Sequence, residues 1–232
     1  NMTEGEPLKL ILPFMVPLLI GNVFQQLYNI ADVVIVGRTI GVEALAAVGS
    51  VTPLFMMTMV LTIGLSNGCT VVTGQRYGAG DMDGMRRSIG TCTVLSVLFT
   101  LLIMLVFHII IDPALVLMNI PLELLEDAKA YVMIIVDGLF AMMGYNLLSG
   151  IMRSLGDSKT PLYFLIVSSV VNIALALFFI LVLGWGVPGS AVALVIAQAI
   201  SAILCLAYIY KRFPQLHISR KDFRLDGPEV WA

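Results

Sequence analysis

The sequence carries no charged residue from 161 to 210, and this uncharged stretch is long enough to cross a lipid bilayer twice. A bilayer core about 30 Å thick is crossed by roughly 20 helical residues that rise 1.5 Å each. Residues 184–189, rich in glycine and proline, divide the stretch into a helical hairpin. The composition agrees, because 12% of all residues are charged, against about 25% in soluble domains. We therefore predict an integral membrane protein.

Six apolar stretches of this length recur along the chain, and each is expected to form one membrane-spanning helix. The expected spans cover residues 10–37, 51–74, 89–111, 128–152, 161–183 and 190–210. The Asp112-Pro113 pair is expected to close the third span, because proline disfavours helical geometry just before it. The predicted fold is all-α, a polytopic bundle of six transmembrane helices over residues 1–210. Residues 211–232 are expected to form a cytoplasmic linker at the membrane surface.

The positions of the lysines and arginines predict how this bundle is oriented. If the N-terminus is cytoplasmic, all but two of the 13 basic residues lie in cytoplasmic segments, and only Arg38 and Lys129 lie outside. The cytoplasmic ones are Lys9, Arg76, Arg86, Arg87, Arg153, Lys159, Lys211, Arg212, Arg220, Lys221 and Arg224. Because basic loops stay in the cytoplasm, we expect a multi-pass protein of the plasma membrane with both ends of this segment cytoplasmic.

The rest of the composition argues against several other classes of protein. The formal net charge of −2 provides no basic field for a nucleic acid. Each of the three cysteines stands alone in an apolar stretch, which argues against a disulfide framework or a metal cluster. The sequence contains no P-loop, HExxH or GxSxG motif. We therefore expect no nucleic-acid partner, no cofactor and no enzymatic activity.

Asp32 is the sharpest functional signal, because a charge in the middle of a membrane costs about 2.5–3.5 kcal/mol on insertion scales. It ends a polar stripe whose members recur every three or four residues and so share one helix face. The stripe consists of Asn22, Gln25 or Gln26, Asn29 and Asp32. We interpret this face as the wall of a wet cavity that binds a coupling ion. The alternative is a hydrogen-bonded seam between helices, with no role in transport.

Asp137 is the acidic residue of the fourth span, and Tyr145 and Ser149 follow it at helical spacing. If the first span leaves the cytoplasm and the fourth enters it, Asp32 and Asp137 both lie in the outer half of the membrane and could share a cavity. Two carboxylates in a low dielectric do not both ionise easily, so one could hold a proton near neutral pH. The alternative is that Asp137 reaches interfacial water as a solvated group.

Proline and methionine residues add two weaker signals. Pro13 and Pro17 lie inside the first span, where proline frees backbone carbonyls and bends the helix. They are candidates for a hinge, with a static kink as the alternative. Methionine and polar side chains could line an adaptable substrate cavity, although packing is the more usual role of such residues. The substrate-cavity candidates are Gln26, Met57, Tyr145 and Gln198.

Several motifs occur in a fixed order along the chain. They are Gln25-Gln26-Leu27-Tyr28-Asn29-Ile30-Ala31-Asp32, Val36-Gly37-Arg38, Ala44-Leu45-Ala46-Ala47-Val48-Gly49, Gly64-Leu65-Ser66, Gln75-Arg76-Tyr77-Gly78-Ala79-Gly80-Asp81, Arg153-Ser154-Leu155-Gly156-Asp157-Ser158-Lys159-Thr160-Pro161 and the turn and helix over 186–198. Together they closely resemble the multidrug and toxic compound extrusion (MATE) family. The resemblance covers nearly the whole chain, in the loops as well as the helices.

The resemblance implies a larger molecule than this chain. Members of that family have twelve transmembrane helices in two six-helix lobes around a central cleft, and they export organic cations in exchange for sodium ions or protons. We therefore expect this chain to be the N-terminal lobe, with the linker at 211–232 truncated and a second six-helix lobe missing. The expected partners are small organic cations, the coupling ion, membrane lipid and that C-terminal lobe.

The family's site residues carry over only in part. Its acidic residue on the first helix matches Asp32, and its asparagine on the fifth matches Asn172, so these two would hold sodium if the protein is sodium-coupled. An aspartate often found four residues later is Ala176 here, and a threonine of the sixth helix falls at Leu194. Because a hard cation takes several oxygen ligands, these departures favour proton coupling. Asp137 is a candidate to replace the lost acid.

Two other functions are kept as alternatives. A flippase of lipid-linked precursors, from a related branch of the same superfamily, would need a basic cavity for pyrophosphate, yet no lysine or arginine lies in the middle of an expected span. A non-transporting membrane scaffold would use the apolar helices alone. An exporter is the leading hypothesis because it explains a deep acid on a helix that also carries two prolines.

Overall fold

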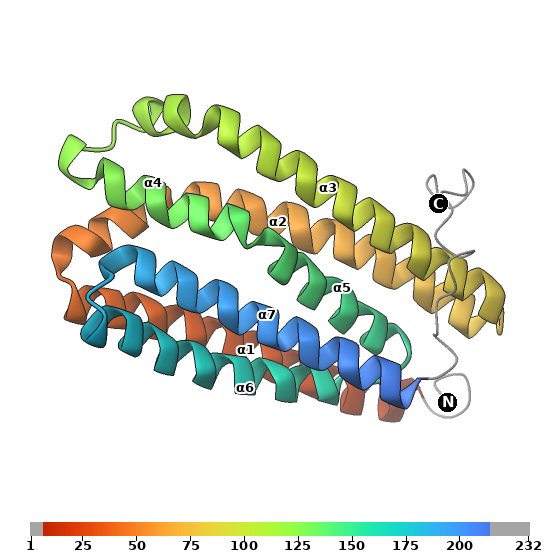
Figure 1. Ribbon diagram of the computed structural model, residues 1–232. Helices are drawn as coiled ribbons and strands as arrows, with labels where there is room; N and C mark the ends of the chain where they lie inside the picture. The colour runs from red at the N-terminus through yellow and green to blue at the C-terminus, as the bar shows by residue number, and fades with distance from the viewer. Residues whose placement is uncertain (1–6, 214–232) are drawn as a thin grey trace.

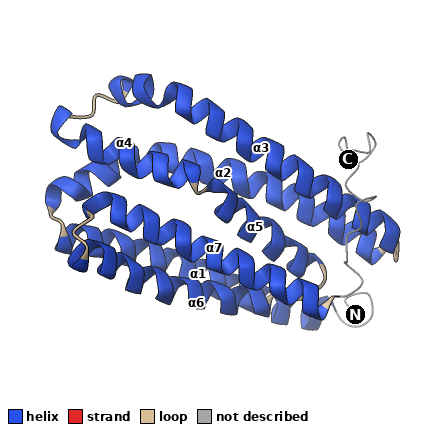
Figure 2. Ribbon diagram, in the orientation of Figure 1, coloured by secondary structure: helices blue, strands red, loops and turns tan. Residues whose placement is uncertain are grey.

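The computed structural model describes residues 7–213, except for the side chains of 7–11, 13, 14, 28 and 29. This part of the chain is helical throughout, with short connections and no strand (Figure 2). The elements in chain order are α1 (Pro7–Thr39), α2 (Val42–Gly78), α3 (Met82–Leu117), α4 (Leu122–Asp137), α5 (Leu139–Ser154), α6 (Lys159–Leu177), the π-helical segment η1 (Phe178–Val182) and α7 (Gly186–Arg212).

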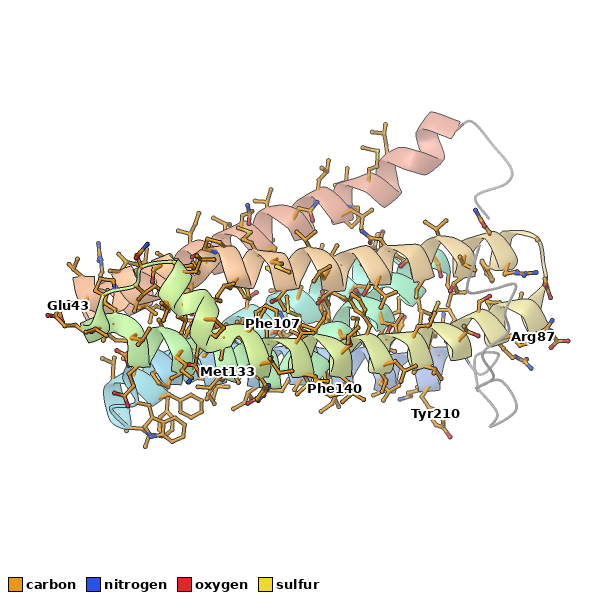
Figure 3. All side chains as sticks on the ribbon, turned by 90° about the horizontal axis from the view of Figure 1, so that it is seen from above. Glu43, Arg87, Phe107, Met133, Phe140 and Tyr210 are labelled. Atoms are coloured by element: carbon orange, nitrogen blue, oxygen red, sulfur yellow. The ribbon has the colours of Figure 1, made fainter. Side chains whose placement is uncertain are left out.

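The helices run alongside one another and form a single elongated bundle (Figure 1). We call the end where α1 begins and α7 ends the terminal end, and the α2–α3 and α5–α6 turns lie there too. The opposite, far end holds the α1–α2, α3–α4 and η1–α7 connections. Glu43 marks the far end in Figure 3, and Arg87 and Tyr210 mark the terminal end.

The expected spans correspond to these helices, and the fold class is confirmed. Five helices are long and apolar enough to cross a membrane, and α4 with α5 makes a sixth span if the bent pair is taken as one. The helices are longer than the apolar stretches because a membrane-spanning helix can extend past the lipid core. The third span does not end at Asp112-Pro113 as expected, because α3 continues through Pro113 to Leu117. Residues 214–232 of the expected linker lie outside the described residues.

The fourth span differs from the expected continuous helix. It breaks after Asp137, and α4 and α5 meet at an angle of 46° around Gly138. A Cβ atom built on Gly138 would lie 2.3 Å from Val195 Cγ2 of α7, so only glycine allows the two helices to approach this closely. The bend lets α4 pack near the far end and α5 near the terminal end of the bundle.

The turn between α2 and α3 illustrates how the sequence ends one helix and begins the next. Gly80 has a positive φ of 74°, which favours glycine. Asp81 caps α3 by accepting a hydrogen bond from the Gly84 amide at 2.8 Å, and it also accepts one from Arg76 Nη1 at 3.1 Å. The amide hydrogen bond is the main reason that the pKa of Asp81 is lower than its ordinary value.

Two apolar clusters hold the bundle together. The larger one lies toward the far end, where Phe107 and Leu115 of α3 and Val136 of α4 are almost completely buried. The smaller one lies toward the terminal end and includes Met85 of α3 and Met152 of α5. Helix α2 packs against α3, α4 and α5, and α7 packs against α4, α5 and α6.

Helix α1 is attached mainly on one side. It packs along α6, where Gly21 faces Leu162, and it diverges from α2 toward the terminal end (Figure 3). Large apolar side chains such as Leu19, Val23 and Leu27 are more than half exposed on α1. The incomplete contact between α1 and α2 creates the space in which the candidate site lies.

Candidate functional site

A cavity of about 240 Å³ opens where α1, α2, α4, α5 and α7 converge. Its polar lining comes from Gln25 and Asp32 of α1, Thr52 of α2, Tyr131 of α4 and Gln198 of α7. Gln25 and Asp32 are seven residues apart, close to two helical turns, which explains why both reach the same cavity. The cavity is therefore an apolar pocket with one carboxylate and a few neutral polar groups around it.

Asp32 is the charged group of this cavity, and it is 9% exposed. Its Oδ1 atom is buried and has no hydrogen-bond partner within the described part of the chain. Leaving a buried acceptor unpaired costs about 1–3 kcal/mol, and more if the group is charged. The geometry therefore provides an unsatisfied negative group that a cation or a proton would neutralise.

Asn172 lies on α6, the helix that packs against α1. Its side chain is fully buried, and neither the amide nitrogen nor the amide oxygen has a partner among the described residues. Asn172 does not line the cavity that contains Asp32. Ala176, one turn further along α6, is also fully buried and supplies no oxygen.

A second cavity, of about 290 Å³, continues the first toward the terminal end. Gln25, Met59, Met142 and Gln198 line both cavities, so the two adjoin, and we refer to them together as the cleft. The second cavity is more polar, and its lining includes side chains from α1, α2, α5, α6 and α7. Among these are Asn22, Asn67, Tyr145, Asn146, Ser149 and Arg153.

The expectation that Asp137 shares a cavity with Asp32 was wrong. Asp137 is the last residue of α4, and its side chain is 56% exposed. It points to α3, where His108 Nε2 lies 3.5 Å from Asp137 Oδ1. Asp137 lines neither part of the cleft. Because of the bend at Gly138, α5 contributes Met142 to the cavity that contains Asp32, and Asp137 lies outside it.

The other sequence candidates divide into two groups. Gln25, Tyr145, Gln198 and the buried Pro17 all line the cleft. Met57 is 52% exposed and Gln26 is also exposed, and neither lines the cleft of this lobe, so their place in a substrate cavity stays a prediction. Met56 and Met59 occupy that wall instead. The side chains of Pro13 and Asn29 lie outside the described residues.

Sequence reasoning missed several polar members of the cleft, among them Tyr131 and Arg153. Tyr131 and Ile135 are the two residues that α4 contributes to the lining of the first cavity, which also contains Asp32 of α1. Arg153 lies in the last turn of α5, where a cytoplasmic loop was expected, and lines the second cavity. Tyr131, Asn146, Ser149 and Arg153 all lie on the broken fourth span, which was expected to contribute Tyr145 and Asp137.

Comparison with known proteins agrees with this architecture. The probable multidrug resistance protein YoeA of Bacillus subtilis (strain 168) is 36% identical over 205 residues, which make up 86% of this chain and 44% of that protein. A crystal structure described as MATE in the bent conformation is 30% identical, with a TM-score of 0.90 over 97% of this chain and 50% of that chain. A structure described as the outward-facing conformation of a multidrug resistance MATE family transporter of the MOP superfamily has the same identity and TM-score.

The matched segments show both the family and the share of it that this chain represents. The chain spans about half the length of the relatives it matches. The family match extends over residues 17–178, from the first part of α1 to the end of α6, and so includes Asp32, Asn172 and Arg153. Because sequence and three-dimensional structure agree over this region, the chain belongs to the MatE family.

Proposed function

We propose that this chain is the N-terminal half of a secondary active exporter that moves organic cations out of the cell in exchange for an ion bound at Asp32. The observation that carries the proposal is the buried, unpartnered Oδ1 of Asp32 in the wall of the cleft. The printed descriptions of relatives as multidrug resistance proteins support export of varied small molecules. A second six-helix lobe would close the other side of the cleft.

Binding of a cation or proton at Asp32 would change the charge of α1 inside the membrane. Helix α1 is the element best placed to respond, because it packs along α6 and only loosely elsewhere. A bend about Pro13 and Pro17 would let its terminal half move while the half that carries Asp32 stays packed. The coupling is then a local electrostatic change that shifts the population of two arrangements of α1.

A proton is the coupling ion that we favour. Sodium would take several oxygen ligands, and two that the family resemblance implies are missing here, because Ala176 and Leu194 carry no side-chain oxygen. Asn172 would join a sodium site only if α1 and α6 rearranged, since it does not line this cavity. Asp137 faces His108 and is not a second acid beside Asp32.

The location of the basic residues supports an orientation with the terminal end in the cytoplasm of a plasma-membrane protein. Arg76, Arg86 and Arg87 lie around the α2–α3 turn, and Lys211 and Arg212 end α7. The α2–α3 turn and the end of α7 both lie at the terminal end (Figure 1). Excess basic charge on one side is typical of the cytoplasmic side.

Two alternatives remain weaker than the exporter. A flippase for lipid-linked precursors would need several basic groups in the cleft, and the described part of its lining contains one arginine, at the end of α5. A membrane scaffold would not need a charged, unpartnered side chain in a cavity, which is costly to keep. The cleft therefore favours transport of a small molecule.

The test uses the full-length protein in proteoliposomes, with proton and sodium gradients imposed separately and a fluorescent organic cation as substrate. Asp32→Asn should abolish gradient-driven efflux and leave the protein folded, because the amide keeps the shape but carries no charge. Asp83→Asn is the matched control, since Asp83 is 88% exposed at the terminal end, and it should transport as the wild type does. Full efflux by Asp32→Asn would refute the proposed role of Asp32.

A further inference from the structure

We propose that Arg153 binds the anionic oxygens of a substrate carboxylate in the second cavity. This inference rests on the proposed export function and names a substrate class for the second cavity. It starts from a charged group that the proposed ion-coupling mechanism does not use. Arg153 lines the cavity that continues from Asp32 toward the terminal end.

The guanidinium of Arg153 is partly buried and lacks an anionic partner. Its hydrogen bond in the described part of the chain goes from Nη2 to Ser149 Oγ at 3.3 Å. Within that same part, no carboxylate lies within 4.0 Å of it, whereas Arg76, Arg86 and Lys129 each have one. An arginine stays charged at any physiological pH and has five N–H donors in a planar fork. Most of those donors are therefore available to a ligand.

The neighbouring groups hold Arg153 in place without neutralising it. Ser149 Oγ donates to the carbonyl of Asn146 at 3.1 Å, which leaves its lone pairs toward the guanidinium. Tyr145 donates to the carbonyl of Pro161 at 3.4 Å. Both hydroxyl groups are therefore fixed by backbone carbonyls. Among the described residues, the lining of this cavity contains no aspartate or glutamate.

The start of α6 adds to the positive character of the same wall. Ser158 and Pro161, at the N-terminal end of that helix, line the cavity, and the N-terminus of a helix carries a partial positive charge. Asp157 is the nearby acid, but it is not in the lining, and its carboxylate accepts from the Thr160 amide at 3.0 Å and the Thr160 hydroxyl at 2.7 Å. It therefore caps α6 rather than pairing with Arg153.

The cleft is thus bipolar, with Asp32 in one half and Arg153 in the other. Met142 lines both halves, and Arg153 follows it by 11 residues on α5, a distance of about 16 Å along the helix axis. A drug-sized molecule at Arg153 would therefore place its apolar body on Met59 and Met142, while Asp32 remains free for the coupling ion. The planar fork of arginine fits a carboxylate with two parallel hydrogen bonds.

The experiment compares two dyes that differ only in one anionic group. Rhodamine B carries a free carboxylate on a cationic ring system, and its ethyl ester has that carboxylate blocked. Fluorescence anisotropy measures the affinity of each dye for the purified full-length protein in a maltoside detergent, which contains no phosphate. Arg153→Ala should weaken binding of rhodamine B about tenfold or more, equivalent to about 1.4 kcal/mol for each factor of ten, and leave the ester unaffected.

Two further variants and one addition make the outcome decisive. Lys159→Ala removes an exposed cation near the same end and should change neither affinity. Arg153→Lys keeps the charge without the fork and should give an intermediate loss of affinity for rhodamine B alone. If the alanine variant does not fold, the ratio of the two dye affinities in Arg153→Lys decides the test. Equal changes for both dyes, or no change for either, would overturn the proposal. The proposal would also be overturned if adding phosphatidylglycerol abolished the difference between the two dyes, because the anion bound at Arg153 would then be a lipid headgroup.

Failure of this inference can be told apart from failure of the proposed function. If Asp32→Asn retains efflux but Arg153→Ala discriminates between the dyes, the coupling role is wrong and the carboxylate site stands. If Asp32→Asn abolishes efflux and both dyes bind the Arg153→Ala variant as they bind the wild type, the exporter stands and the carboxylate site is refuted.

Discussion

Replacing Gly138 by alanine should loosen the junction of α4, α5 and α7 beside the Asp32 cavity. The new Cβ would lie 2.3 Å and 2.5 Å from the two Cγ atoms of Val195 and 2.9 Å from its Cβ, whereas carbon atoms in contact are about 3.5–4.0 Å apart. Rotation of Val195 cannot relieve all three contacts, so the helices must separate by more than about 1 Å.

Overpacking of this kind costs about 1–3 kcal/mol. Gly138 has a φ of −82°, which alanine adopts without strain, so the loss of chain entropy on folding decreases by up to about 1 kcal/mol. We expect a net destabilisation of about 1–2 kcal/mol, and therefore a lower thermal midpoint. Thermal unfolding of the full-length protein, followed by size-exclusion chromatography, measures the change.

Gly144→Ala is the matched control, because Gly144 lies on α5 and also faces α7. Its new Cβ would lie 3.5 Å from Ala202 Cβ of α7, which is an ordinary contact. That variant should keep or slightly raise the midpoint. Adding Val195→Ala to Gly138→Ala removes the two closest atoms and should recover at least about 0.5 kcal/mol as a coupling energy. Equal midpoints for the two glycine variants, or no recovery in the double variant, would show that the close approach of α5 and α7 does not limit stability.

Two further changes test the polar groups of the bundle. Asp81→Ala should lower the thermal midpoint at neutral pH. Because the pKa of Asp81 is lowered in the folded protein, its contribution to the free energy of unfolding is present above the ordinary value of 3.8 and is lost as the pH falls through the folded-state pKa. A difference in midpoint between variant and wild type that persists at lower pH would contradict this. Asn172→Ala should cost less than about 1 kcal/mol, because the loss of packing is offset by removal of a buried amide without partners, which is worth about 1–3 kcal/mol. A drop in midpoint typical of a core truncation, about 2–5 kcal/mol, would show that the amide has partners in solution.

The sequence predicted six spans in the right order, with α4 and α5 counted as one, because lipid imposes a minimum apolar length on each span. It also placed Gln25 and Asp32 together, since both lie on one face of one helix and no other helix is needed to relate them. Helix ends were predicted less well. Pro113 was expected to end the third span, but α3 continues through it, because the loss of one backbone hydrogen bond near a helix terminus is small beside the packing of Leu115 in the core.

The contributions of the fourth span could not be read from its sequence. Whether Asp137 or Arg153 reaches the cleft depends on the direction of the bend at Gly138, and that bend depends on contact with Val195, 57 positions later in the chain. Helical periodicity assumes a straight axis, so it predicts the wrong face beyond a break. The same limit applies between helices, since the separation of Asn172 from the Asp32 cavity follows from how α6 packs against α1.

The buried polar groups separate into those that the fold satisfies by itself and those that it does not. Along α2, the hydroxyl groups of Thr58, Thr62 and Ser66 each donate to the carbonyl four residues earlier. The buried side-chain atoms without partners in the described chain belong to Ser88, Ser96, Asp32 and Asn172. A serine hydroxyl can rotate to reach the same kind of carbonyl. The carboxylate of Asp32 has no hydrogen to donate when ionised, and rotation cannot provide one. Its neutralisation therefore requires a proton or cation from outside the fold, which is the role that we propose for the coupling ion.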